Sequence, residues 1–490
     1  MTMRDLYNER HAMIQEELHG LLPVQVLLTE FDGRYYLFHE RDSINRLTRV
    51  AFFHKESLKL LQSFPELLLM DSTYNTNRFN LPLVHITGQT CLNQTFLVGG
   101  AFMRENEESY VWLLEQLIKV YRAHNLDLPH TLVTDADRSI SAARRRVLPK
   151  TNHMLCIWHV KRNIQATAKK HIKLNAIRAG VADDHIRNLV EEEWATLEED
   201  CNKVLHASSI ENFEDAWDSF QQKHRPKYIS IVDYIKNQWL SKKEQIIPAW
   251  TDKHLHYGIR ATSRIESFHK VIKNELPSRK AHLRDVLTRL HEYLSIRIND
   301  TRQAIEKERF THYPGLDNFI FKDCLRVVSS YALKLVKKEL DALSVDERSP
   351  LPHCTGRFKS SMGLPCRHTL KQRKACNESL KPDDFDARWY LSLEASTAID
   401  PRILVQEPET IVRSHSPAKQ SFTGRILSTF EQVDDELNSV GRKGSSRARG
   451  ARRGGHGSRG RGRGGRNNRG ARRLGTVNVE GGTFITMRLD

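Results

Sequence analysis

Two aspartates end apolar, strand-like runs, and their placement suits metal-dependent chemistry. Asp71 ends the run that begins at residue 67, and Asp135 ends the run that begins at residue 131. In an open α/β sheet, side chains at the carboxyl ends of strands line the crevice in which ligands bind. A single aspartate at such a place is more often a turn former or a helix cap. Two of them on neighbouring strands favour a site.

A third carboxylate, Glu266, lies in the first turn of a helix that Thr262 or Ser263 is expected to cap. A glutamate in this turn also serves as the acidic residue of a capping box, which is the alternative interpretation. Three carboxylates that converge on one point repel one another unless hard cations neutralise them. Two Mg²⁺ ions about 4 Å apart would support the in-line displacement of a phosphodiester.

The elements that must position these residues have the pattern of an α/β domain. Alternating and helical spacings predict a mixed sheet, because three strands are followed by a helix, a strand, a helix and a strand. The strands are expected at 67–71, 81–87, 94–103, 131–135 and 153–158, and the helices at 110–121 and 138–147, with shorter strand-like runs at 26–28 and 35–38. Helical spacing without strands continues over 159–250, and two more helices are expected over 283–309 and 325–343.

The motifs around these carboxylates resemble the transposase domain of Mutator-like elements (MULEs). They are Asp71-Ser-Thr-Tyr-Asn-Thr-Asn, Thr134-Asp-Ala-Asp, Cys156-Ile-Trp-His and Thr262-Ser-Arg-Ile-Glu-Ser-Phe-His. The far-red-response transcription factors of plants, domesticated from such elements, share this domain. The resemblance implies an RNase H-like α/β fold in which an all-helical insertion interrupts the catalytic DDE triad.

Carried over residue by residue, the resemblance implies that the triad is Asp71, Asp135 and Glu266, and that these carboxylates bind Mg²⁺ or Mn²⁺ in a two-metal site. We prefer Asp135 to Asp137 because Asp135 directly ends the predicted strand. The implied activity is that of a DDE transposase, which cleaves DNA at element ends and transfers the strand to target DNA.

Cys156 and His159 match the C-x-x-H signature of the family, and the resemblance implies that they support the active site or contact DNA. Spacing alone would make this pair only a weak metal half-site, and a structural histidine is the alternative. Trp158, inside the motif, is expected to be a core residue rather than a platform for a nucleic-acid base.

A later Cys/His segment resembles a SWIM zinc finger, whose pattern is C-x-C, a short spacer and C-x-H. Cys354, Cys366 and His368 match the last three positions as Zn²⁺ ligands. The first cysteine would fall at Pro352, which cannot ligate zinc, so His353 is the tentative fourth ligand. Structural zinc is nearly always tetrahedral with four protein ligands. A loop with two buried cysteines is the alternative.

Most of the positive charge lies near the C-terminus. Residues 441–473 contain 12 Arg, one Lys, 11 Gly and no acidic residue, whereas the whole chain carries a net charge of +16. Such a Gly/Arg tract cannot bury a core and is expected to be disordered. Its fixed charges suit the phosphate backbone of DNA or RNA, although a merely solvated low-complexity end is the alternative. The expected nucleic-acid contacts are Arg447, Arg449, Arg452, Arg453, Arg459, Arg461, Arg463 and Arg466.

Composition excludes several other classes of protein. No run of about 18 apolar residues is present, which excludes a transmembrane helix, and the charged start does not read as a secretory signal. Seven scattered cysteines in 490 residues do not make a disulfide scaffold and fit a reducing compartment. We expect an intracellular, nuclear protein with DNA as its partner, RNA as a further partner of the tail, no membrane contact, and a homo-oligomer as one candidate state.

The predicted regions are a remnant N-terminal region (1–48), the first part of the transposase core (49–160), the helical insertion (161–255), the final part of the core (256–310), a helical connector (311–348), the SWIM-type finger (349–372), a helical or linker region (373–440), the Gly/Arg tail (441–475) and the C-terminal end (476–490). The leading hypothesis is a DDE transposase. The alternatives are a domesticated, non-cutting transcription regulator that binds DNA, and an RNA-binding protein that acts through the tail.

Overall fold

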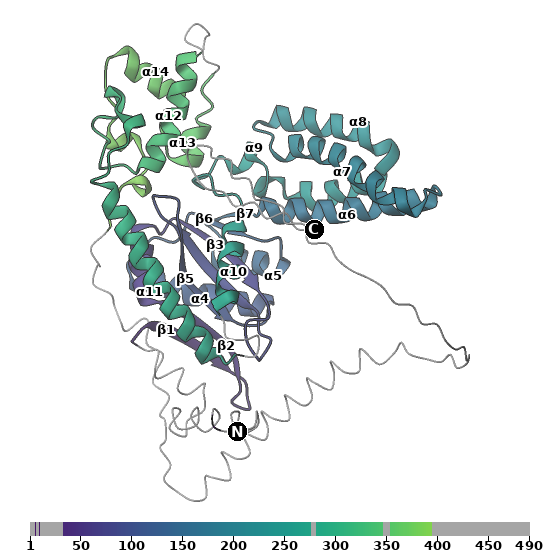
Figure 1. Cartoon of the computed structure of the whole chain (residues 1–490), viewed down its shortest axis with the longest axis horizontal. Helices are drawn as coiled ribbons and strands as arrows, with labels where there is room; N and C mark the ends of the chain where they lie inside the picture. The colour runs from purple at the N-terminus through teal and green to yellow at the C-terminus, as the bar shows by residue number, and fades with distance from the viewer. Residues whose placement is uncertain (1–4, 6–8, 10–32, 276–280, 346–352, 394–490) are drawn as a thin grey trace, which may run out of the picture. The chain divides into compact units, whose positions relative to one another are not determined.

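The computed structural model describes residues 5, 9, 33–275, 281–345 and 353–393 (Figure 1). All of them belong to the first of two compact units of the chain, residues 1–408. The strand-like run at 26–28, the Gly/Arg tail and the C-terminal end lie outside the described residues. No helix in the described part is long and apolar enough to cross a membrane.

A seven-stranded mixed sheet forms the centre of the fold, in the order β1-β2-β5-β4-β3-β6-β7. The first five strands pair antiparallel, whereas β3 with β6 and β6 with β7 pair in parallel. This sheet confirms the mixed α/β class predicted from the sequence. The strands are β1 (Tyr35–Arg41), β2 (Leu47–His54), β3 (Leu67–Thr73), β4 (Leu83–Gln89), β5 (Thr95–Phe102), β6 (Thr131–Thr134) and β7 (Asn152–Leu155).

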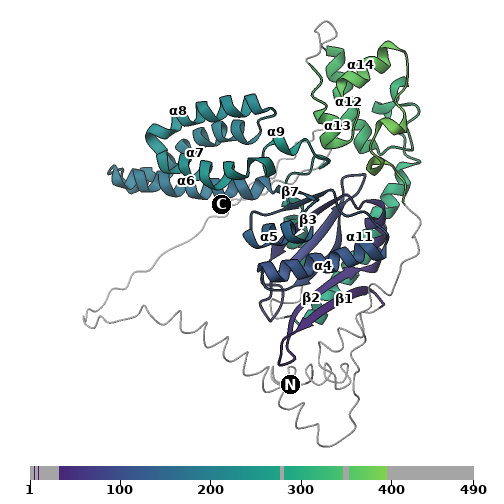
Figure 2. The ribbon, with the colours of Figure 1, turned by 180° about the vertical axis from the view of Figure 1, so that it is seen from behind.

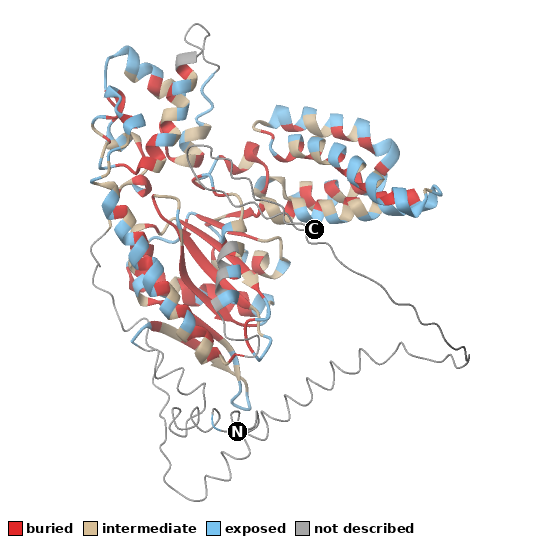
Figure 3. Ribbon diagram, viewed as in Figure 1, coloured by how far each residue is buried: buried red, intermediate tan, exposed pale blue. Residues whose placement is uncertain are grey.

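Neighbouring residues of β3 belong to two different hydrophobic cores, because successive side chains of a strand point to opposite faces. Leu69 packs in the core that contains Ile265 of α10 (Ser263–Glu275), whereas Leu68 packs in the core that contains α4 (Glu107–Ala123). Figures 1 and 2 show α10 and α4 on opposite sides of the sheet. The central strands are buried along most of their length (Figure 3).

Three further helices surround the sheet, namely α3 (Lys55–Ser63), α5 (Arg138–Val147) and α11 (Leu283–Glu308). The helices predicted over 138–147 and 283–309 are therefore present. Strand β2 was not predicted, because Thr48 and Arg49 interrupt its apolar pattern, although its second half is fully buried.

Two predicted elements differ from the structure at their ends. The strand predicted over 153–158 stops at Leu155, because only residues 152–155 pair with β6, and α6 (Ile157–Arg178) begins two residues later. The helix predicted over 325–343 begins only at Ser330, in α12 (Ser330–Val345). The Glu308 carboxylate accepts a hydrogen bond from the Ser330 amide at 2.9 Å, which fixes the start of this helix.

The segment for which the sequence predicted a helical insertion contains helices and no strand within its described residues. The long helices α6, α7 (Asp183–Leu205) and α8 (Ile210–Tyr234) enclose a hydrophobic core of their own. Shorter helices follow, namely η1 (Ile235–Trp239), η2 (Leu240–Gln245) and α9 (Pro248–Thr251). The chain then returns to the sheet and enters α10, so the insertion separates the strands from the helix that carries Glu266.

Candidate active site

Asp71 lies near the carboxyl end of β3, and Asp135 directly follows the neighbouring strand β6. In the parallel pairing of β3 with β6, Leu69 lies opposite Val133. Continuing that register by two residues brings Asp71 level with Asp135, on the face that α10 covers. Because adjacent strands are about 4.8 Å apart, this places the two residues next to each other.

Helix α10 brings Glu266 to Asp71. Ligand atoms of Asp71, His159 and Glu266 all lie within 4.8 Å of one another, and His159 Nε2 is 3.6 Å from a Glu266 carboxylate oxygen. Asp135 does not belong to this close group, although its charge acts on Asp71. Two of the predicted carboxylates, Asp71 of β3 and Glu266 of α10, therefore lie close together with His159. Asp135 lies outside this close group.

Asp137 has a different role from Asp135. Its carboxylate is the N-cap of α5 and accepts hydrogen bonds from the amides of Ser139 at 2.7 Å and Ile140 at 3.2 Å. Asp135 Oδ1 accepts one hydrogen bond, from the Asp137 amide at 3.2 Å. The capping role of Asp137 agrees with the choice of Asp135 as the candidate site residue.

The charged forms of Asp71 and Asp135 are unfavourable in this site without a cation. Burial raises the pKa of Asp71 to about 7; His159 opposes this shift, and the charges of Asp135 and Glu266 add to it. Burial also raises the pKa of Asp135. Oxygen donors held this close suit a hard divalent ion such as Mg²⁺ or Mn²⁺, and the imidazole of His159 suits Mn²⁺ better than Mg²⁺.

These shifts predict that Asp71→Asn stabilises the protein in the absence of Mg²⁺ and Mn²⁺. The pKa of Asp71 is higher in the folded than in the unfolded protein. The free energy of unfolding of the wild type therefore falls as pH rises from about 4 to 7, because the unfolded state loses this proton more readily. Three pKa units correspond to roughly 4 kcal/mol, which is an upper limit here. The urea midpoint of Asp71→Asn should exceed that of the wild type at pH 8 and equal it near pH 4. The exposed control Asp127→Asn should change neither value, and equal midpoints of Asp71→Asn and wild type at pH 8 would contradict the assignment.

The C-x-x-H pair contacts the residue that precedes α10. The backbone amide of Thr262 donates a hydrogen bond to Cys156 Sγ at 3.2 Å, and the Thr262 hydroxyl lies 3.5 Å from His159 Nδ1. Burial opposes ionisation of Cys156, but hydrogen bonds with His159 and Thr262 outweigh it and lower the pKa of the thiol. Cys156 and His159 thus fix the start of the helix that carries Glu266.

Trp158 and Arg162 at the start of α6 were missed as candidate site residues. Trp158 is half-buried, and its ring centroid lies 4.8 Å from that of His159 in an edge-on contact. The Arg162 guanidinium lies 5.0 Å from the centre of the Trp158 ring. The position of Trp158 directly before His159 in the motif was the signal in the sequence that could have identified it.

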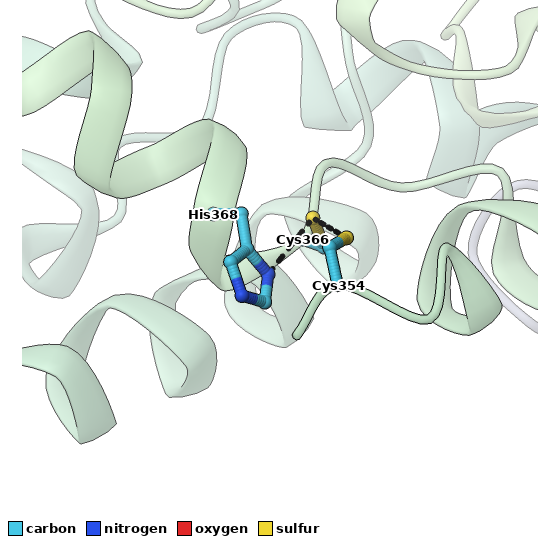
Figure 4. Close-up of side chains that lie close together, drawn as sticks. All are labelled: Cys354, Cys366 and His368. Atoms are coloured by element: carbon cyan, nitrogen blue, oxygen red, sulfur yellow. Dashed lines mark hydrogen bonds between the residues drawn. The ribbon is translucent and has the colours of Figure 1, made fainter. Parts of the chain in front are cut away.

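A second group of metal-ligand side chains lies at the ends of two short helices, α13 (Arg357–Met362) and α14 (Arg367–Ala375) (Figure 4). We call Cys354, Cys366 and His368 the Cys/His group. The two Sγ atoms are 3.8 Å apart, and Cys366 Sγ is 3.9 Å from His368 Nδ1.

This geometry fits a zinc ion. Two sulfurs bound to one tetrahedral Zn²⁺ at about 2.3 Å lie roughly 3.8 Å apart. Burial opposes ionisation of Cys366, but hydrogen bonds with Thr369 and His368 lower the pKa of its thiol to about 7, toward the thiolate that metal binding needs. His353, the tentative fourth ligand, is exposed and is not part of the group found among the described residues.

Residues 67–163 match the model of the MULE transposase domain. They contain Asp71, Asp135, Cys156 and His159, and Glu266 lies beyond them. The fold and the site therefore define a protein with a transposase-type α/β domain.

Curated proteins agree with this match. The chain is 23% identical to FAR1-RELATED SEQUENCE 5 of Arabidopsis thaliana over 291 residues, which cover 56% of this chain and 34% of that protein. It is 23% identical to FAR-RED IMPAIRED RESPONSE 1 of the same plant over 270 residues, 51% of this chain and 31% of that protein. It is also 22% identical to the PKS-NRPS hybrid synthetase cheA of Chaetomium globosum over 423 residues, 80% of this chain and 9% of that protein. The chain therefore carries a segment with the MULE transposase domain and is similar to the far-red-response proteins. It spans about a third or less of the length of these relatives.

Proposed function

We propose that this protein is a DDE-class transposase with an RNase H-like core, which cleaves DNA and transfers the cut strand with the help of Mg²⁺ or Mn²⁺. The observation that carries the proposal is the meeting of Asp71 and Glu266, from β3 and α10. Asp135 directly follows the neighbouring strand β6, and its charge acts on Asp71. Asp71, Asp135 and Glu266 would hold divalent ions there, which would activate water and stabilise the charge that develops on the phosphodiester.

The side chains of this chain have separate tasks in the proposed site. Asp71, Asp135 and Glu266 supply the oxygen ligands. His159 contacts Glu266 and, with Cys156, holds the start of α10, so that the glutamate is fixed relative to the sheet. Trp158 and Arg162 offer an aromatic face and a positive charge for a nucleotide next to the reacting phosphate.

Supercoiled plasmid DNA tests the proposal. The purified full chain should nick it with Mg²⁺ or Mn²⁺ and leave it intact in EDTA. The second candidate function, a nuclear transcription regulator without cleavage, is favoured by the similarity to the far-red-response proteins. DNA binding without metal-dependent nicking would support that candidate and contradict ours.

We also propose that the Cys/His group binds one structural Zn²⁺. Cys366→Ser should therefore reduce the bound zinc, which we expect to be about one equivalent in the wild type, to less than a tenth of an equivalent. Cys376→Ser is the matched control, because Cys376 is an exposed cysteine at the end of α14 that is not part of the group. Elemental analysis of the dialysed proteins measures the difference. Wild-type protein with less than half an equivalent, or undiminished zinc in Cys366→Ser, would contradict the site.

A further inference from the structure

Helix α13 lies between two members of the Cys/His group and contacts the segment that leads to Glu266. Cys354 precedes this helix by three residues, and Cys366 follows its end by four. We call residues 252–262, which run from the end of α9 to the residue before α10, the connection. The connection and α13 are more than 90 residues apart in the sequence but are joined by several hydrogen bonds.

One of these contacts is an ion pair. Arg357 Nε donates to Asp252 Oδ2 at 2.7 Å, and Arg357 Nη1 donates to the carbonyl oxygen of Ser208 at 2.9 Å. Asp252 is buried, and its other carboxylate oxygen lies 3.0 Å from His256 Nε2. Burial opposes ionisation of Asp252, but His256 and Arg357 outweigh it and lower the pKa of this carboxyl. Without Arg357, a buried charge would lose a partner.

Backbone hydrogen bonds run alongside this ion pair. The amides of His256 and Tyr257 both donate to the carbonyl oxygen of Ser361, at 3.0 and 2.8 Å. The Ser360 hydroxyl donates to the carbonyl oxygen of Asp252 at 2.7 Å. Residues from both ends of α13 therefore hold the first half of the connection.

The second half of the connection is held by the catalytic domain and the insertion. The Arg260 guanidinium donates to the carbonyl oxygen of Ile246 at 2.6 Å, and the carbonyl oxygen of Arg260 accepts from the Ile157 amide at 3.0 Å. Thr262 donates to Cys156. Because Glu266 follows Thr262 by four residues, a shift of the connection that reaches Thr262 changes where this carboxylate lies.

Hydrophobic packing joins the same parts. Leu364 and Leu370 share one core with Tyr257 and Ile259 of the connection and with Ile265 of α10. Gly363, at the end of α13, has φ of +64°, and a Cβ there would lie 2.4 Å from the Cβ of Asp386. The segment around the Cys/His group therefore shares its hydrophobic core with the α/β domain and does not form a separate domain.

We propose that zinc bound at the Cys/His group helps to hold Glu266, the proposed catalytic glutamate, in position. Arg357 and Asp252 are then positioning residues. A metal ion at the Cys/His group fixes both ends of α13, Arg357 and Ser361 hold the connection on that helix, and the connection sets the position of Glu266. The consequence for catalysis rests on the proposed function. The link between the Cys/His group and residues 252–262 does not.

Amide hydrogen exchange of the full-length, zinc-loaded protein tests the link. Arg357→Ala should speed exchange over residues 252–262 at least tenfold and leave the zinc content unchanged, since Arg357 is no ligand. Lys359→Ala is the matched control, because it removes an exposed positive charge from the same helix, and it should change neither value. Asp252→Asn, which keeps the size of the side chain, should reproduce the effect if Arg357→Ala folds poorly.

Removing zinc from the wild type with a chelator should speed exchange over the same residues. The proposal would be overturned if exchange over 252–262 stayed unchanged both in Arg357→Ala and after zinc removal. The segment with the Cys/His group would then be independent of the connection.

Nicking kinetics then distinguish the positioning role of Arg357 from a role in DNA binding. Arg357→Ala should lower kcat at least tenfold, change KM for DNA less than twofold and raise the Mg²⁺ concentration needed for half-maximal rate, and Arg357→Lys should recover part of the loss. A change in KM alone would overturn the positioning role in favour of a DNA contact. If the wild type does not nick DNA, the proposed function fails, whereas the exchange experiment still decides the link.

Discussion

Asp71→Asn, Asp135→Asn and Glu266→Gln should each reduce metal-dependent nicking by at least about 10³-fold. Each change replaces one charged ligand oxygen by an amide nitrogen and keeps the size of the side chain. Loss of roughly 4 kcal/mol of transition-state stabilisation corresponds to about this factor. Initial rates on supercoiled plasmid DNA, at saturating Mn²⁺, measure the effect.

Asp137→Ser is the matched control for Asp135→Asn. It removes a neighbouring negative charge, and serine is as good an N-cap for α5 as aspartate, so the helix keeps its cap. Its rate should stay within about threefold of the wild type. The opposite result, in which Asp137→Ser is inactive and Asp135→Asn is active, would exchange the roles of these two residues. If Asp71→Asn, Asp135→Asn or Glu266→Gln nicked DNA at the wild-type rate, the substituted residue would not be a catalytic residue.

Deleting residues 441–473 should cause the second large effect, which is the loss of binding to nucleic acid of arbitrary sequence. These residues carry 12 Arg and one Lys. For roughly 6 to 10 phosphate contacts, the affinity of the full chain should fall by about 10³ to 10⁵ between 50 and 200 mM salt. Fluorescence anisotropy with labelled single-stranded RNA and duplex DNA measures both quantities.

The same titration separates the candidate partners of the tail. Similar losses for RNA and DNA after the deletion indicate contacts with phosphate alone, whereas a loss confined to RNA indicates an RNA-binding role. A control chain in which these arginines and the lysine are replaced by glutamine keeps the length of the tail and should behave like the deletion. An affinity that is flat over this salt range, or that survives the deletion, would contradict the prediction.

Local pattern and spacing in the sequence are enough to single out the two aspartates as candidate site residues. Asp71 and Asp135 each end an apolar run, and in the structure Asp71 lies in β3 while Asp135 directly follows β6, the parallel neighbour of β3. Their alternation with Leu69 and Val133 also fixes the face on which they lie. Glu266 needed the family motif, because a helix-start glutamate has an ordinary structural use.

Other features depend on contacts between distant segments, which no local pattern reveals. His159, rather than Asp135, forms the close group with Asp71 and Glu266, because α6 begins directly after β7 and its first turn contacts the start of α10. Arg357 pairs with Asp252 across 105 residues of sequence. Asp252 belongs to no motif, and Arg357 is only a spacer residue of the SWIM-like segment. Only the folded structure therefore shows that the segment with the Cys/His group and the connection to Glu266 are joined.

The position of bound manganese tests the central claim most directly. Crystals of the protein grown with Mn²⁺ and measured at the manganese absorption edge should show anomalous density within bonding distance, about 2.2 Å, of carboxylate oxygens of Asp71 and Glu266, with Asp135 as a further ligand. The density should be lost in Asp71→Asn. No anomalous density at these three carboxylates in the wild type, under conditions where the protein nicks DNA, would contradict the account.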